Sequence, residues 1–234
     1  MSIILLKIFV VVSYISMIFM NYLANALPLN NQNTGQISDK YPSLFTPSGF
    51  TFSIWGIIYL LLGAYVVKTV LTSSVGLEEQ YLQTTMLIFI LTSILNILWL
   101  VFWHYERIVL SSITMAIFLS LLLYVVMIIP NNQILIKSAF SLYAGWLSVA
   151  FIANVTITII NLDIKFFLNR ELFWYIIIMI VGVLIVGFVV LTTKNIVYGL
   201  VFVWAYYGIL MKHKSQVGHF VSEPWAFNVT VVSF

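Results

Sequence analysis

Seven continuous apolar runs, separated by short polar connections, constrain the fold of this chain more than any other feature. Most of them reach the roughly 18–25 residues with which an α-helix crosses about 30 Å of hydrocarbon. The last run is the shortest of the seven. The runs cover Ile3–Met20, Phe50–Val67, Tyr81–Trp103, Ile108–Ile129, Ser138–Ile160, Leu172–Thr193 and Ile196–Met211.

Charged residues are too few to cover a water-exposed surface. Only 7% of the 234 residues are charged and 62% are apolar, whereas a soluble domain carries about 25% charge. A soluble enzyme and a disordered chain are therefore excluded. The net charge is +3, and the Lys and Arg residues do not cluster into a basic patch. We therefore expect no nucleic-acid partner.

The continuity of the runs favours helices, because a barrel strand would alternate polar and apolar residues over about ten positions. Short connections such as 104–107 and 194–195 indicate antiparallel neighbours. The sequence thus predicts an all-α, polytopic transmembrane helix bundle. We expect a five-helix core over residues 1–165, two additional helices over 166–214 and a tail over 215–234. The expected partner is the lipid bilayer, and the expected location is the cell membrane.

One connection, from Tyr22 to about Ser48, is long and polar. Such loops are often lids or binding loops, and a passive linker is the alternative. Lys and Arg counts on the two sides of the bundle, six against four, weakly favour an outside N-terminus. A cleaved signal peptide, ending at the small residues 24–26, is a less favoured interpretation of the first run.

The middle of every run is free of Asp, Glu, Lys and Arg. Ion-coupled transporters need ionisable groups there, so that class is not expected. A retinal pigment is not expected either, because the last two runs have no mid-membrane lysine. Cysteine is absent and the three histidines have no metal-binding spacing. We therefore assign no metal site and no catalytic residue.

The polar-neutral and aromatic residues inside the runs are the remaining candidates for function. The amides of Asn96 and Asn154 should face another helix or a cavity; they either join helices or line a binding site. Tryptophans near run ends normally form an interfacial belt, which suits Trp103, Trp174 and Trp204. Trp55 and Trp146 lie deeper in their runs, so the belt explains them less well.

Residues 21–164 resemble the TspO/MBR family of tryptophan-rich sensory proteins. The family pattern has Pro-Ser-Trp before the second helix, then Trp and Leu-Tyr, an Asn and Trp in the third helix, and Tyr, Trp and Asn in the fifth. Here the matching segments are PSLFTP at 42–47, FSIWGIIY at 52–59, LNILW at 95–99 and LYAGWLSVAFIAN at 142–154.

The resemblance implies a five-helix bundle, often homodimeric, with a cavity under the long first loop. It also implies a flat apolar ligand of the porphyrin or haem-related tetrapyrrole type. Two family tryptophans that line this cavity fall on Trp55 and Trp146, and an indole face can stack on a flat macrocycle. The candidate ligand-binding residues are Trp55, Tyr59, Asn96, Trp99, Tyr143, Trp146 and Asn154.

The chain also departs from the family pattern. Leu44, Thr46 and Gly49 replace residues that are often Trp, Pro and Trp, and Leu142 replaces the Pro before Tyr143. No tyrosine follows Asn154 in the family's cholesterol motif, so sterol binding through that weak motif is not supported. Residues 172–211 add two runs for which the sequence gives no role.

Three functions remain open. The first is a receptor or sensor that binds a flat apolar ligand without covalent attachment. The second is a transporter of small apolar molecules, motivated by the seven runs and the long loop. The third is an enzyme that degrades porphyrin in light at Trp55 and Trp146. The sequence favours the receptor over the enzyme.

Overall fold

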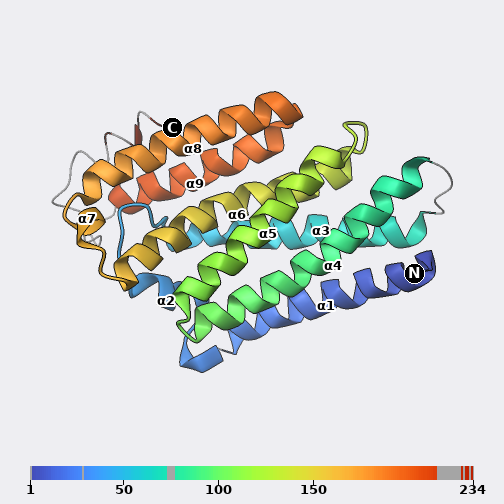
Figure 1. The fold of residues 1–234 in the computed structure, drawn as a ribbon, viewed down its shortest axis with the longest axis horizontal. Coiled ribbons are helices and arrows are strands. Elements are labelled where there is room, and N and C mark those ends of the chain that lie inside the picture. The colour runs from blue at the N-terminus through green and yellow to red at the C-terminus, as the bar shows by residue number, and fades with distance from the viewer. Residues whose placement is uncertain are drawn as a thin grey trace.

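The chain forms a bundle of seven long helices, seen in a computed structural model that describes residues 2–27, 29–72, 77–214, 228, 230, 231 and 233, the side chains of 77–80 excepted. All seven predicted runs are helical and apolar enough to cross a membrane, and the described residues contain no strand (Figure 1). The protein is therefore an all-α, multi-pass integral membrane protein. The long helices are α1 (Ile3–Ala26), α3 (Ile54–Leu71), α4 (Leu77–His104), α5 (Ile108–Ile128), α6 (Ile134–Asn161), α8 (Glu171–Thr193) and α9 (Ile196–Lys214).

The helices extend beyond the apolar runs by up to several residues. α1 continues to Ala26 and α6 begins at Ile134, because polar residues at helix ends lie at the membrane surface. Helix ends coincide with residues that leave helical geometry: Glu106, Asp163 and Lys194 have φ of 52°, 50° and 52°. The predicted tail, 215–234, lies outside the described residues except for four positions, of which Thr230 hydrogen-bonds Tyr175 of α8.

The sequence suggested a loop without regular structure between α1 and α3, but this connection contains short helices. It contains the 3-10 helices η1 (Leu29–Asn31) and η2 (Gly49–Ser53) and the short helix α2 (Thr34–Asp39). A reciprocal pair of hydrogen bonds between Asn33 and Gln36, a capping box, begins α2. We call residues 29–48 the lid. A further short helix, α7 (Lys165–Leu168), lies between α6 and α8.

Three long helices, α3, α5 and α9, pack directly on α6. α1 packs on α3 and α4, α5 lies between α4 and α6, and α3 also packs on α6. α9 covers another face of α6, and α8 packs on α9 at the edge of the molecule (Figure 1). α9 also contacts η2, so the C-terminal pair of helices touches the segment that leads from the lid into α3.

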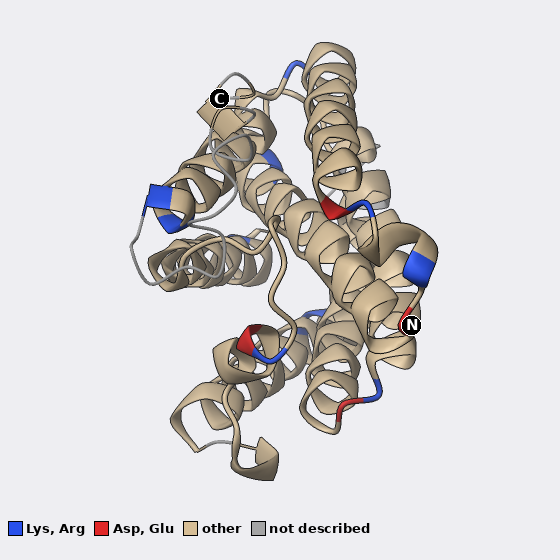
Figure 2. Cartoon of the chain, turned by 90° about the vertical axis from the view of Figure 1, so that its left-hand side faces the viewer, with Lys and Arg blue, Asp and Glu red and all other residues tan. Residues whose placement is uncertain are grey.

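Charged residues lie at or near helix ends and in the connections (Figure 2). At the end opposite the lid, Lys7 donates to the backbone oxygen of Thr72 at 2.6 Å and Lys68 to Gln133 at 2.9 Å. Lys137 donates to the backbone oxygen of Ile129 at 3.0 Å. These contacts join helix ends where water and headgroups replace hydrocarbon.

Glycines allow α9 to approach its neighbours closely. The backbone N–H of Ser48 donates to the oxygen of Gly208 at 3.1 Å. A Cβ atom at Gly208 would overlap Thr51 Oγ1 and would lie 3.0 Å from Thr51 Cβ. The position is therefore filled by the backbone and side chain of η2, and a larger residue would push α9 away from it.

We predict that Gly208→Ala lowers stability by about 1–3 kcal/mol, the usual cost of overpacking. The measurement is the thermal midpoint in detergent, followed by loss of soluble monomer on gel filtration. Gly187→Ala in α8 is the matched control, because a Cβ there meets nothing within 4 Å. Equal midpoints for the two variants would contradict the close contact between α9 and η2.

Candidate functional site

The lid is held against the connection between α4 and α5. Trp103 Nε1–H donates to the backbone oxygen of Thr34 at 3.2 Å, and the Asn30 amide donates to the backbone oxygen of His104 at 3.0 Å. Glu106 accepts from Lys40, which also forms an ion pair with it, and from Tyr41 at 3.4 Å. The lid is thus attached at several points along its length.

Glu106 is the charged centre of this attachment. The hydrogen bond from Lys40 is the largest cause that lowers the pKa of its carboxyl group, and Gln32 and Tyr41 lower it further against a smaller opposing effect of burial. Glu106 lies between α4 and α5, outside the membrane-spanning helices. Its ionised form therefore stabilises the closed lid.

A cavity of about 840 Å³ lies beneath the lid. Small-molecule sites commonly enclose about 300–1,000 Å³. Lid residues and α1 form one side of the cavity, η2 and α3 another, and α4 and α9 contribute one or two residues each. Its walls include Asn21, Asn25, Asn33, Ser38, Asp39, Phe52, Trp55, Tyr59, Trp99 and Lys212.

Aromatic rings from η2 and α3 form the apolar wall. Trp55 and Tyr59 are one helical turn apart and their rings stack, with centroids 5.4 Å apart and planes inclined by 21°. Trp55 also meets Tyr143 edge to face at 5.9 Å. On the α4 side, Trp99 stacks on Trp103 at 6.1 Å. The cavity therefore has two aromatic surfaces.

A hydrogen-bonded chain lies at the inner end of the cavity and joins three helices. Asn21 of α1 donates to Asn96 of α4 at 2.7 Å, and Asn96 donates to the hydroxyl of Tyr143 in α6 at 3.1 Å. All three side chains are buried. Asn96 and Tyr143 do not line the cavity themselves. They contact the lining residues Asn21 and Trp55, respectively.

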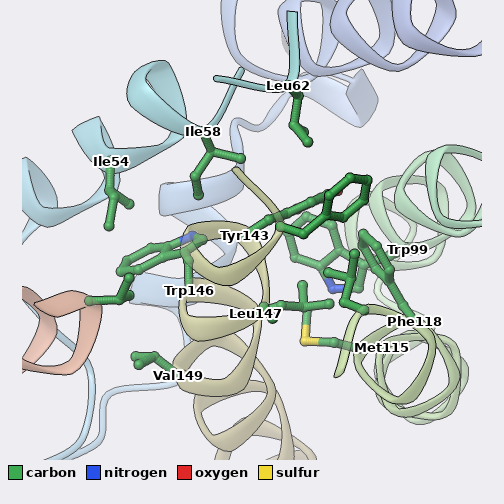
Figure 3. Close-up of a cluster of buried hydrophobic side chains, with 14 of the residues drawn as sticks. Ile54, Ile58, Leu62, Trp99, Met115, Phe118, Tyr143, Trp146, Leu147 and Val149 are labelled. Carbon is green, nitrogen blue, oxygen red and sulfur yellow. The ribbon is translucent and has the colours of Figure 1, made fainter. Parts of the chain in front are cut away.

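The other two predicted residues lie behind the aromatic wall. Trp146 is buried and meets Trp55 edge to face at 6.3 Å, and Figure 3 shows it between α6 and the Ile54 and Ile58 side chains of α3. Trp146 and Asn154 line a small neighbouring pocket of about 50 Å³. Asn154 donates to Ser111 at 2.9 Å and accepts from Ser112, so it joins α6 to α5.

Two buried indole donors in this region have no hydrogen-bond partner among the described residues, Trp99 Nε1 and Trp146 Nε1. Buried polar groups are normally satisfied. Trp99 lines both the large cavity and the small pocket. Its N–H is therefore a candidate donor for a hydrogen bond to an acceptor on a bound molecule.

The belt interpretation is wrong for Trp103, which is 4% exposed and covered by α2. Trp204 and Trp174 also pack within the protein: Trp204 Nε1–H donates to the backbone oxygen of Thr51 at 2.9 Å, and Trp174 lies 4.4 Å from the Phe167 ring. The sequence did not predict the short elements that contact these indoles: α2 covers Trp103, η2 bonds the half-buried Trp204, and α7 contacts the half-buried Trp174.

Several cavity residues were missed by sequence reasoning. Phe52 contacts Trp146 edge to face at 5.7 Å, and its position three residues before Trp55 could have suggested it. Asp39 and Lys212 line the cavity from the lid and from the end of α9. No sequence signal brings Lys212 to the lid, because that contact depends on how α9 packs against η2.

We predict that Asn96→Leu destabilises the protein by about 1–3 kcal/mol, because Asn21 and the Tyr143 hydroxyl lose their shared partner in a buried site. Thermal unfolding in detergent measures it. Ser120→Ala is the control, since this exposed hydroxyl bonds only its own helix, at 2.8 Å. Unfolding of Asn96→Leu at the wild-type temperature would contradict a structural role for the chain.

Replacing Glu106 with Gln should weaken the attachment of the lid, and the stability difference between wild type and variant should depend on pH. Because the folded-state pKa is lowered, the carboxylate stabilises the fold fully above its usual pKa of about 4.3, and this contribution disappears as pH falls through the lowered value. We expect the wild type to exceed Glu106→Gln by about 0.2–1 kcal/mol at pH 7. The difference in melting temperature should shrink as pH falls through the lowered pKa of Glu106; a difference independent of pH would contradict the ion pair.

Comparison with known proteins places the chain in a family. A sequence model of the family described as TSPO-like protein matches residues 7–233. The match includes residues 172–211, so it extends beyond the 21–164 segment whose motifs carry the resemblance. No curated protein and no solved structure gives a significant match. The chain, by a match over nearly its whole length, belongs to the TSPO-like family.

Proposed function

We propose that this membrane protein is a TspO-like receptor that binds a flat apolar ligand, of the porphyrin or tetrapyrrole type, in the cavity beneath the lid. The observation that carries the proposal is the aromatic wall formed by Trp55, Tyr59 and Trp99 on a cavity of about 840 Å³. Flat conjugated molecules stack well on such rings. The expected location is the cell membrane, and a homodimer is the expected assembly.

The polar side of the cavity further restricts the class of ligand that would fit. Amides of Asn21, Asn25 and Asn33 face the same space as Lys212 and Asp39. A suitable ligand therefore has a flat apolar body and a polar edge, as a porphyrin with carboxylate groups does. The unpartnered indole N–H of Trp99 adds one donor for such a ligand.

The structure supports different roles for the candidate residues. Trp55, Tyr59 and Trp99 are on the cavity wall, so they are the proposed contact residues. Asn96 and Tyr143 join α4 to α6 behind the cavity, and Asn154 joins α5 to α6. Trp146 is in ring contact with Trp55. The enzymatic alternative depends on Trp146, because its electron-rich indole would be the reaction partner of a photoexcited porphyrin bound at Trp55.

Protoporphyrin quenching of tryptophan fluorescence in detergent tests the proposal. We expect Trp55→Leu and Trp99→Leu each to weaken the affinity about tenfold, which corresponds to about 1.4 kcal/mol of lost stacking and burial. Trp174→Phe is the control, because Trp174 lies outside this cavity. Trp146→Phe should change the affinity less than Trp55→Leu does.

Unchanged affinity in the Trp55→Leu and Trp99→Leu double variant would reject the assigned site. Two further measurements on the same sample separate the alternatives. Ligand flux in proteoliposomes would favour the transporter. Loss of the porphyrin absorption band under light, dependent on Trp146, would favour the enzyme; binding with neither effect supports a receptor.

A further inference from the structure

A second hollow, which we call the α6–α8 groove, is lined by lid residues 42–45, whereas lid residues 46–48 line the ligand cavity. It has a volume of about 560 Å³. Its walls are Phe151, Val155 and Ile159 of α6 and Ile178, Val181 and Ile185 of α8. α8 itself packs on α9 and α7, and the space between it and α6 is the groove.

The groove is apolar and lies between membrane-spanning helices. Val181 and Ile185 are 44% and 41% exposed, so its α8 wall faces hydrocarbon when the protein is in a bilayer. Water has few polar partners in such a space. A lipid acyl chain can fill it with apolar contacts instead.

The end of the groove near the lid has a different chemistry. The backbone N–H of Leu44 donates to Glu171 Oε1 at 3.0 Å and closes this end. Trp174, which lines the groove, has a buried Nε1 with no hydrogen-bond partner among the described residues. An indole donor without a partner among the described residues thus belongs to a side chain at this end of the groove.

Arg170 supplies the charge at this end. It lies between the groove residues Leu168 and Glu171, is exposed, and forms no ion pair with any residue that the structure describes. The nearby Lys165 is paired with Asp163 at 2.6 Å, and Glu171 is bonded to Leu44. Arg170 is thus a cation next to this end of the groove, and its guanidinium suits a phosphate group.

We propose that the α6–α8 groove binds one phospholipid, with an acyl chain between α6 and α8 and the phosphate at Arg170 and the Trp174 N–H. The site is independent of the ligand cavity. Residues 42–45 line the groove and residues 46–48 line the cavity, and no residue lines both.

Native mass spectrometry of the detergent-purified chain, with dioleoyl phosphatidylglycerol added, tests the site. We expect one phospholipid to remain bound to the wild type at detergent concentrations that remove the others. Ile178→Trp and Val155→Phe, which fill the groove from opposite walls, should abolish this retention. Leu184→Trp is the matched control, because Leu184 is 66% exposed on α8 and does not line the groove.

Arg170→Gln tests the headgroup contact. It should weaken phosphatidylglycerol binding about tenfold, the effect of losing one charge-assisted contact, and leave dioleoylglycerol binding unchanged. Arg107→Gln, on the α4–α5 connection, is the control. Added phosphatidylglycerol should raise the melting temperature of the wild type and not of Ile178→Trp, as expected for a ligand of the folded state.

Several results would overturn the proposal. One is equal retention in Ile178→Trp, Val155→Phe and Leu184→Trp, which would indicate lipid bound around the whole bundle. Another is equal loss of phosphatidylglycerol and dioleoylglycerol in Arg170→Gln. Displacement of the phospholipid by cholesterol would assign the groove to a sterol. Protoporphyrin affinity should be the same in Ile178→Trp and Leu184→Trp, so failure here is distinct from failure of the ligand cavity.

Discussion

The hydrogen-bonded chain of Asn21, Asn96 and Tyr143 is the interaction on which the candidate site depends. In a membrane interior, helices gain little from hydrophobic association, and buried polar contacts and close packing hold them together. This chain joins α1, α4 and α6, the helices that face the cavity or carry its supporting rings. Trp99 lies on α4, one turn from Asn96, and the Tyr143 ring meets Trp55 of α3 edge to face, so both aromatic surfaces of the cavity adjoin this chain.

The C-terminal pair of helices becomes part of the same arrangement through α9. Gly208 accepts from Ser48 and leaves room for Thr51, and Trp204 donates to the backbone of Thr51. These contacts hold η2, from which α3 and Trp55 continue. α9 also brings Lys212 to the cavity. Of the two helices to which the sequence assigned no role, α9 therefore packs on η2 and adds Lys212 to the cavity wall, and α8 forms one wall of the α6–α8 groove.

Much of the fold could be predicted from the sequence, because hydrocarbon imposes one rule on every spanning segment: an apolar surface with its backbone bonded internally. That rule gives all seven helices without tertiary information. The lid was harder, since α2 is six residues long and only its capping residues Asn33 and Gln36 signal it. Because this helix was not predicted, nothing in the sequence showed that α2 covers Trp103, and Trp103 was assigned to the lipid interface. Lys212 could not be placed at all before the packing of α9 was known.

The central claim is that the cavity beneath the lid holds the ligand, and protection of a single cysteine tests it most directly. The chain has no cysteine, so Asn25→Cys on the cavity wall and Asn132→Cys at the opposite end each give one labelling site. The account predicts that protoporphyrin slows maleimide labelling of Asn25→Cys by about tenfold, the factor for 90% occupancy, and leaves Asn132→Cys unchanged. Equal labelling rates with and without saturating protoporphyrin at Asn25→Cys would contradict it.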